Sequence, residues 1–194
     1  MPSAQADLFA APRPLPGLAS AEDIVSRAEE RALIAAIDAA PLEPFRFQGW
    51  LGKRLTVSYG WRYDFEDASF GPTEPIPDAF LPVRERAAAL AGLSADQLVQ
   101  CLLIRYDPGA GIGWHRDRPV FGDVVGVSLG APATMRFRRR KAGGFERRTV
   151  QLPSRGAYHL TGEARDVWEH SIAEMAETRW SITFRSIQRE KRAR

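Results

Sequence analysis

Three residues of the chain have the chemistry and spacing of metal ligands: His115, Asp117 and His170. In the stretch GWHRDRPVF, Gly113 to Phe121, an imidazole and a carboxylate stand one residue apart. Side chains on a β-strand alternate between its two faces, so this spacing predicts that His115 and Asp117 point to the same side. Such a pair is also common at ordinary polar strand ends, so a metal site needs a third ligand.

The third ligand has to come from the two other histidines, His159 and His170. His170 lies in DVWEHSI, shortly before the segment RWSITFR, whereas His159 has no role in this pattern and is expected to be structural. His115, Asp117 and His170 together form a 2-His-1-carboxylate set. Such a set leaves positions open on Fe(II) for a chelating co-substrate and for O₂.

The segment RWSITFR separates its residues onto two faces of a predicted strand. The apolar face holds Trp180, Ile182 and Phe184, and the polar face holds Arg179, Ser181, Thr183 and Arg185. Two arginines on one face favour an anion between them, because a buried guanidinium needs a partner. At ~3.3 Å per residue their Cα atoms lie roughly 20 Å apart, so their side chains could reach opposite ends of a small dicarboxylate. The alternative is an outer strand with a hydrated polar face.

These residues, with the phrases RYDPGAGIGWHRD and VSLGAPATMRF, resemble the AlkB-type 2-oxoglutarate and Fe(II)-dependent dioxygenases from about Trp61 to Ile187. The resemblance implies a double-stranded β-helix, or jelly roll, with iron at its mouth. It also implies a role for each site residue. His115, Asp117 and His170 would hold the iron, and the 2-oxoglutarate site would include Arg179 at the far carboxylate, Arg185 near the keto-acid end, the hydroxyl of Tyr106, and Ser181.

The chain departs from the family pattern at two positions. Many members carry an asparagine two residues before the tyrosine, where this chain has Ile104, so one hydrogen bond to the co-substrate is expected to be missing. Nucleotide demethylases of the family often carry an acidic residue two positions after the metal aspartate, where this chain has Pro119. The base preference therefore does not follow from the resemblance.

Substrate contacts are expected from two further segments. The stretch VSYGWRYDFEDASFGP resembles the nucleotide-recognition lid of the family, with Tyr59, Trp61 and Tyr63 as candidates to grip an extruded base. The alternative for these aromatics is packing at a strand edge. Residues 136–148 are strongly basic, and Arg138 and Arg140 are the candidates there for holding phosphates. A solvated hairpin is the alternative interpretation of that charge.

The elements that must position these residues are mostly strands. We predict strands at 54–65, 99–106, 124–129, 133–138, 147–152, 157–160, 167–172 and 179–187. A capping box, Ser26 to Glu29, begins a helix that Pro41 ends, and a second helix runs from Pro82 towards Gly92. The sequence therefore predicts a mostly-β (α+β) fold, a jelly roll with N-terminal helices packed on the sheet.

Composition limits the domain organisation. A chain of 194 residues with 44% hydrophobic residues fits one domain, which we place at 20–188, after a flexible extension at 1–19 and before a basic tail at 189–194. The single cysteine, Cys101, lies in an apolar run and is expected to be a buried small hydrophobe. No run approaches the ~20 apolar residues that a membrane span needs. We expect a cytoplasmic monomer that does not enter a membrane.

The stretch QADLF, Gln5 to Phe9, resembles the short peptide by which bacterial replication and repair proteins bind the sliding clamp. In that interpretation Leu8 and Phe9 enter an apolar pocket of the clamp. The alternative is that both side chains cover an apolar patch of the domain itself.

The function predicted from the sequence is oxidative removal of alkyl groups from nucleic-acid bases, with Fe(II), 2-oxoglutarate and O₂ as cofactors and alkylated DNA or RNA as partner. The products would be formaldehyde, succinate and CO₂. One alternative is an oxygenase that acts on a modified tRNA nucleoside or on a protein side chain. Another is a nucleic-acid-binding protein without turnover.

Overall fold

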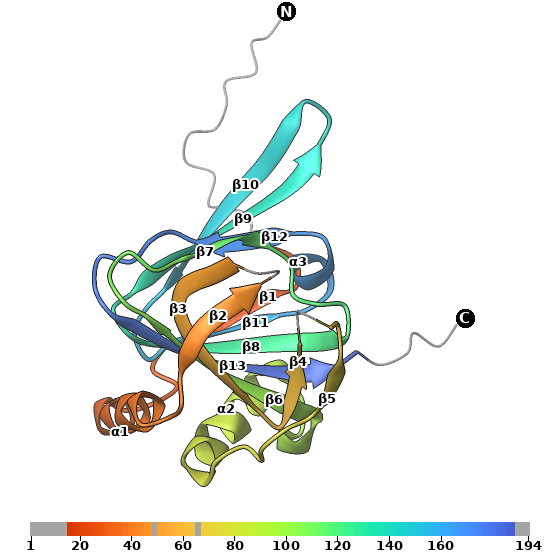
Figure 1. Ribbon diagram of the computed structural model, residues 1–194. Coiled ribbons are helices and arrows are strands. Elements are labelled where there is room, and N and C mark those ends of the chain that lie inside the picture. The colour runs from red at the N-terminus through yellow and green to blue at the C-terminus, as the bar shows by residue number, and fades with distance from the viewer. Residues whose placement is uncertain (1–14, 48–49, 65–66, 189–194) are drawn as a thin grey trace, which may run out of the picture.

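Most strands of the protein form two facing antiparallel sheets in the computed structural model, which describes residues 15–47, 50–64 and 67–188 (Figure 1). The large sheet consists, in spatial order, of β1 (Leu18–Ala21), β11 (Ala157–Leu160), β8 (Phe121–Gly130), β13 (Arg179–Ile187), β6 (Leu98–Tyr106), β3 (Trp50–Tyr59) and β2 (Glu43–Phe47). The small sheet consists of β10 (Gly144–Leu152), β9 (Ala133–Lys141), β12 (Glu169–Ile172) and β7 (Ile112–His115). The prediction of a mostly-β jelly roll is confirmed.

Two helices cover the outer side of the large sheet (Figure 1). α1 (Arg27–Asp38) begins with the predicted capping box, and α2 (Leu81–Ala91) ends at Gly92 in the left-handed conformation. Short helical turns η1 (Asp78–Phe80) and η2 (Ala95–Gln97) flank α2, and α3 (Gly162–Asp166) follows β11. No helix in the described ranges has the length and apolar character that crossing a membrane requires.

The apolar core is divided between the two sides of the large sheet. On the helix side, Leu33 and Ile37 of α1 and Val83 of α2 pack against Ile182 and Phe184 of β13. This cluster, the helix-side core, also contains the buried Cys101. Between the sheets a second cluster includes Met135, Phe137, Tyr158 and Ile172. The alternation predicted for β13 is therefore present, with its polar residues facing the space between the sheets.

The predicted strand 54–65 is two strands, β3 and β4 (Trp61–Tyr63), because the chain turns at Gly60. Gly60 has a φ of +78°, and a Cβ atom there would lie 2.1 Å from the carbonyl oxygen of Val99. Only glycine fits such a backbone. β4 then pairs with β5 (Phe70–Pro72) in a separate two-stranded sheet.

The folded domain begins earlier than the predicted residue 20. Leu15 is buried in the core between the sheets, and β1 pairs with β11 from Leu18 to Ala21. The predicted extension 1–19 is therefore wrong for residues 15–19, since burial of Leu15 and an edge pairing hold them. The sliding-clamp motif, Gln5 to Phe9, and the basic tail at 189–194 lie outside the described residues.

Candidate metal centre

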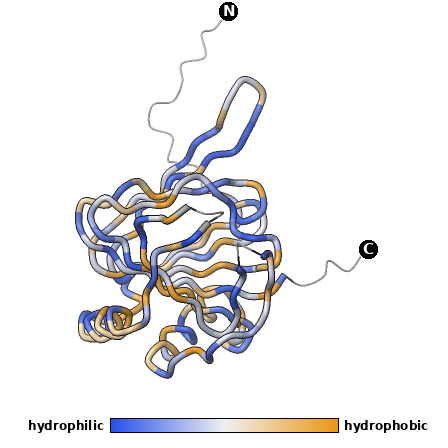
Figure 2. The backbone as a smooth tube through the Cα atoms, viewed as in Figure 1, coloured by the Kyte–Doolittle hydropathy of each residue, from blue (hydrophilic) through white to orange (hydrophobic). Residues whose placement is uncertain are grey.

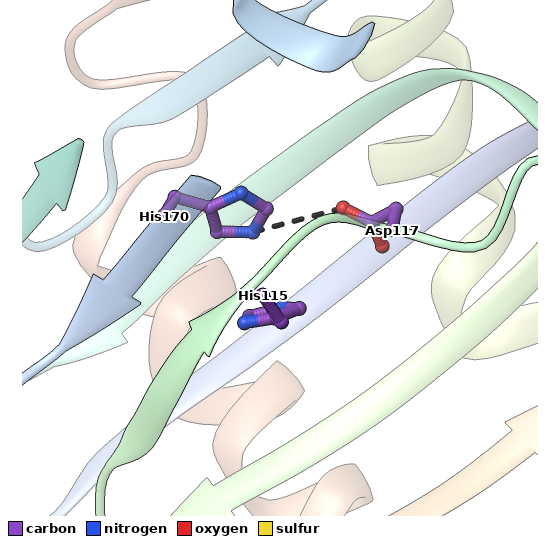
Figure 3. Close-up of side chains that lie close together, drawn as sticks. All are labelled: His115, Asp117 and His170. Atoms are coloured by element: carbon purple, nitrogen blue, oxygen red, sulfur yellow. Dashed lines mark ion pairs between the residues drawn. The ribbon is translucent and has the colours of Figure 1, made fainter. Parts of the chain in front are cut away.

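The side chains of His115, Asp117 and His170 point towards one another between the two sheets (Figure 3). His115 ends β7, and His170 lies directly opposite it on β12. Their ring centroids are 4.3 Å apart, and Nε2 of His170 lies 3.6 Å from Oδ2 of Asp117. The available ligand atoms of the three residues all lie within 4.8 Å of one another. This arrangement fits one metal ion bound on one side by two imidazoles and a carboxylate.

Strand alternation, from which we predicted the convergence of His115 and Asp117, is the wrong reason for it. β7 ends at His115, and Asp117 lies in the loop that follows rather than on the same strand. The carboxylate is instead held by Arg185 of β13, whose Nε and Nη2 lie 2.8 and 2.7 Å from Oδ1 of Asp117. The same loop is fixed by Arg165, which donates to the carbonyl of Arg118 at 2.6 Å. Tertiary contacts, not strand periodicity, build this site.

The protonation states of the three residues suit metal binding. Burial lowers the pKa of His170 to about 3, and burial also lowers the pKa of His115, so both imidazoles are neutral. Nδ1 of His115 donates to the carbonyl of Gly113 at 2.9 Å, which leaves Nε2 as the free ligand atom. Burial would raise the pKa of Asp117, but the positive charge of Arg185 holds it below its ordinary value. Asp117 is therefore ionised.

Arg179 supplies a second anchor, of the kind that a carboxylate co-substrate needs. Its side chain is 1% exposed, and Nε donates to the hydroxyl of Ser128 at 3.1 Å. Within the described chain, Nη1 and Nη2 of Arg179 are buried without any hydrogen-bond partner. A buried charge with unpaired N–H groups is costly unless an anion binds there. The residues present therefore fit a carboxylate ligand such as 2-oxoglutarate.

The other predicted co-substrate residues lie around Arg179. Tyr106 is its partner across β6 and β13, and the guanidinium lies 5.2 Å from the centre of the Tyr106 ring. Ser181 is buried on the same inner face and lies opposite Ile104, which occupies the position where the family pattern has asparagine. Their roles in binding 2-oxoglutarate stay predictions.

Arg185 has polar partners within the protein, unlike the terminal nitrogens of Arg179. Its guanidinium is occupied by Asp117 and, through Nη1, by Oε1 of Gln100 at 2.8 Å. Arg185 therefore orients the metal carboxylate. The expectation that both arginines reach opposite ends of one dicarboxylate, with Arg185 near the keto-acid end, stays a prediction.

Two of the three aromatic residues predicted to contact the substrate, Trp61 and Tyr63, are connected to the segment that carries Asp117. Trp61 contacts Phe70 of β5 with ring centroids 4.9 Å apart, and Phe70 contacts Phe121 edge-on at 5.5 Å. Phe121 in turn lies under the guanidinium of Arg185, 5.2 Å from it. Tyr63, on the same face as Trp61, lies 4.9 Å from the guanidinium of Arg118, the residue after Asp117. These contacts connect β4 and β5 to the residues around the metal centre, and the roles of Trp61 and Tyr63 in substrate binding stay predictions.

Tyr59 does not belong to this group, and its prediction as a substrate residue is wrong. It is the last residue of β3 and packs against the helix-side core. The positions of a β-strand alternate, and Tyr59 falls on the side that faces the helices. The edge-packing alternative holds for this residue.

The basic hairpin β9–β10 projects from the body of the molecule, and its strands are largely hydrophilic (Figures 1 and 2). Phe137 and His170 are partners on the inner face of the small sheet, so Arg136 and Arg138 lie on the outer face. The pairs Arg138–Arg147 and Arg140–Phe145 extend this outer face along the hairpin. Arg138 and Arg140 are therefore turned away from the metal centre and cannot contact a base bound there.

Charge is unequally balanced on the two faces of the hairpin. On the inner side, Arg139 pairs with Glu146 and Glu163 at 2.9 and 2.6 Å, and Arg148 also pairs with Glu146. On the outer side only Arg138 has a carboxylate, that of Glu169 at 2.6 Å. Among the described residues, the remaining outer arginines have no carboxylate partner; these are Arg136, Arg140 and Arg147.

Sequence reasoning missed several residues that line the site. Ser128 and Gln100 bind the two arginines of β13, and Tyr158, whose pKa burial raises to about 12, packs against Gly126 beside them. Arg54 of β3 was missed as well. Each of these residues lies on a strand that pairs with strands distant in the sequence. Only the pairing register of those strands brings the residue to the site.

Residues 42–189 match the family model of the 2OG-Fe(II) oxygenase superfamily. The tRNA (carboxymethyluridine(34)-5-O)-methyltransferase alkbh8 of Xenopus tropicalis is 30% identical over 81% of this chain but only 25% of its own length. The α-ketoglutarate-dependent dioxygenase AlkB of Salmonella typhimurium is 30% identical over 71% of this chain and 66% of its own. The chain thus spans about a quarter of the alkbh8 relative.

The solved structure of OsALKBH1 has the same fold. It superimposes with a TM-score of 0.67 over 89% of this chain and 97% of its own, at 15% identity. The match of the family model, the two relatives and the triad His115, Asp117 and His170 agree. The chain belongs to the 2OG-Fe(II) oxygenase superfamily, as an AlkB-type enzyme that uses Fe(II), 2-oxoglutarate and O₂.

Proposed function

We propose that the protein removes N-alkyl groups from nucleic-acid bases by oxidation. When bound, iron and 2-oxoglutarate supply the oxidising chemistry, in which one atom of O₂ enters succinate as CO₂ is lost and the other enters a C–H bond of the substrate. An N-methyl group becomes N-hydroxymethyl, which breaks its N–C bond to leave N–H and formaldehyde. His115, Asp117 and His170 would hold the iron, and Arg179 would hold the co-substrate.

The observation that carries the nucleic-acid assignment is the unbalanced charge of the outer hairpin face. Within the described part of the chain, Arg136, Arg140 and Arg147 share this face without carboxylate partners, while Arg139 and Arg148 of the other face are paired. Unneutralised arginines on one face are the electrostatic footprint of a polyanion partner. Because this face points away from the metal centre, it would bind phosphates of the flanking strand while the base enters the site.

The aromatic side chains at the metal loop support the same proposal. Tyr63 contacts Arg118 in the loop that carries Asp117, and Trp61 contacts Phe70, which in turn contacts Phe121. Aromatic rings bind the faces of unstacked bases irrespective of base identity. An extruded base can reach a site between two sheets that a duplex cannot enter.

The direct test is release of formaldehyde and succinate by purified protein with Fe(II), 2-oxoglutarate and O₂. The substrates are single-stranded DNA and RNA with 1-methyladenine or 3-methylcytosine, compared with methylated peptides, and His115→Ala is the control. Formaldehyde from an oligonucleotide, absent with His115→Ala, would support the proposal. Succinate with formaldehyde only from peptides would overturn it.

Oxidation of a modified tRNA nucleoside is the second candidate. The observation that favours it is the 30% identity to alkbh8, whose name describes action on a tRNA carboxymethyluridine. The methyltransferase in that name belongs to a protein of which this chain matches a quarter. Mass spectrometry of nucleosides from total tRNA, before and after incubation with the protein, would show a gain of one oxygen atom or the loss of a methyl group.

Removing two outer-face arginines, as Arg140→Gln with Arg147→Gln, is expected to weaken binding of single-stranded oligonucleotides. It should also lower the slope of log K against log salt by roughly 0.7 for each phosphate that is no longer bound. Fluorescence anisotropy at several salt concentrations measures both. Arg27→Gln with Arg31→Gln removes the same charge from exposed positions on α1 and should leave the slope unchanged. Equal effects of the two double variants would contradict the assignment of this face.

A further inference from the structure

Arg54 is a third arginine on the inner face of the large sheet. Thr56 of β3 pairs with Ile104 of β6, which puts Arg54 next to Tyr106 on the neighbouring strand. Val57 packs against the helix-side core, so the alternate residues, Arg54 and Thr56, face the space between the sheets. The register therefore brings Arg54 to the site that contains Arg179 and Asp117.

The guanidinium of Arg54 packs against the ring of Phe45 and has no carboxylate partner among the described residues. Its Cζ lies 3.9 Å from the centroid of Phe45 on β2, so the ring covers one face of the guanidinium. The N–H groups lie in the plane of the guanidinium and keep their capacity to donate. None of the side-chain hydrogen bonds and ion pairs found in the described chain involves Arg54.

The charged residues around Arg54 do not supply a partner for its guanidinium. Burial lowers its pKa below the ordinary value, Arg185 lowers it further and Asp117 acts in the opposite direction, so both lie within electrostatic reach. Asp117, however, is already bound by Arg185 at 2.7 Å and belongs to the candidate ligand set.

Iron and 2-oxoglutarate, when bound, would leave the charge of Arg54 unmatched as well. The two carboxylates of 2-oxoglutarate and that of Asp117 would not outweigh the charges of Fe(II), Arg179 and Arg185. Both histidines are neutral and add nothing to this balance. Arg54 therefore adds to an excess of positive charge in a partly buried site, and such an excess favours binding of an anion there.

We propose that Arg54 and Phe45 form an anion subsite that binds an oxyanion of the substrate at the metal centre. The oxyanion is a phosphate beside the target nucleotide or a carboxylate carried by the modified base. The proposal rests on the proposed function for the reaction and adds that the substrate is anionic at this point. A planar guanidinium recognises either group through paired N–H donors.

Binding without turnover tests the subsite. The protein is loaded with 2-oxoglutarate and with Zn(II) in place of iron, and anisotropy is measured with two matched pairs of single-stranded oligonucleotides. One pair compares normal phosphates with neutral methylphosphonates on both sides of 1-methyladenine. The other pair compares a uridine that carries a carboxymethyl group with its methyl ester. We expect one of the two pairs to respond. In that pair, the oligonucleotide without the anion should bind the unmodified protein roughly tenfold to a hundredfold more weakly than its charged counterpart.

The same loss should change binding to Arg54→Gln by less than about twofold, and the pair that responds identifies the source of the anion. Arg54→Lys should retain part of the dependence on the anion, because lysine keeps the positive charge but lacks the paired N–H donors of the planar guanidinium. Lys53→Gln is the matched control, since Lys53 is the neighbouring residue on β3 with a side chain that is 70% exposed. Lys53→Gln should behave as the unmodified protein does.

Two results would overturn the subsite. The first is an equal effect of anion removal in the unmodified protein and in Arg54→Gln for both pairs. The second is a loss of 2-oxoglutarate affinity in Arg54→Gln, measured by calorimetry, because Arg54 would then bind the co-substrate.

A separate titration keeps this proposal distinct from the proposed function. Inorganic phosphate is added to the Zn(II)- and 2-oxoglutarate-loaded protein, and the Nε–Hε resonance of Arg54 is followed by NMR, assigned by its absence in Arg54→Gln. If no oligonucleotide binds, the proposed function fails. A phosphate-dependent shift of the Arg54 resonance would still support the subsite, and an unmoved resonance would overturn it.

Discussion

Asp117→Asn is expected to weaken Fe(II) binding by more than about a hundredfold and to abolish succinate formation. The amide is neutral and a poor ligand, and loss of a direct ligand should exceed the 10–100-fold effect usual for residues that only support one. The variant also leaves Arg185, whose side chain is 12% exposed, without its counter-charge. The metal-free protein should therefore lose about 3 kcal/mol of unfolding free energy.

Anaerobic calorimetry with Fe(II) and urea unfolding measure the two effects separately. Asp123→Asn is the matched control, because Asp123 also binds a histidine, His159, at 2.8 Å, but lies outside the triad. That variant should keep iron affinity. Full succinate formation by Asp117→Asn would remove Asp117 from the set of metal ligands.

Arg179→Met is expected to have two opposite effects. It should raise the Michaelis constant for 2-oxoglutarate by about 30-fold or more, because loss of a buried charged partner costs about 2–5 kcal/mol of binding. It should also stabilise the protein without co-substrate, because Nη1 and Nη2 of Arg179 are buried without partners. Replacement of such a charge by an apolar side chain of similar length removes a desolvation cost.

Thermal unfolding with and without 2-oxoglutarate checks both effects at once. Addition of 2-oxoglutarate should raise the melting temperature of the unmodified protein and leave that of Arg179→Met unchanged. Arg165→Met is the control for loss of a buried arginine whose guanidinium is bonded to carbonyls, and it should lower stability. A less stable Arg179→Met with normal 2-oxoglutarate affinity would make Arg179 a structural residue.

The parts of the fold that follow from short-range pattern were predictable. The alternation of RWSITFR fixes which residues of β13 face the helices, and the capping box at Ser26 fixes the start of α1. Both depend on backbone geometry within a few residues. Strand β11 was predicted with its observed bounds, Ala157–Leu160, for the same reason.

The parts that depend on pairing between distant strands were not predictable. Asp117 reaches the histidines because Arg185, 68 residues later, binds it, not because of strand periodicity. Arg54 and Tyr59 lie on the same strand, but only the register of β3 with β6 shows that Arg54 faces the site and Tyr59 the helices. The turn at Gly60 likewise depends on its close approach to Val99.

Burial of Cys101 affects how readily alkylating agents could modify the protein. Reagents that alkylate ring nitrogens of bases also attack thiolates, and a thiolate forms only where the pKa of the thiol is low and the sulfur is accessible. Cys101 is fully buried in the helix-side core, and burial raises the pKa of its thiol. As the sole cysteine of the chain, it leaves no thiol open to modification. The buried thiol therefore suits the proposed function, because agents that alkylate bases would also alkylate an accessible thiol.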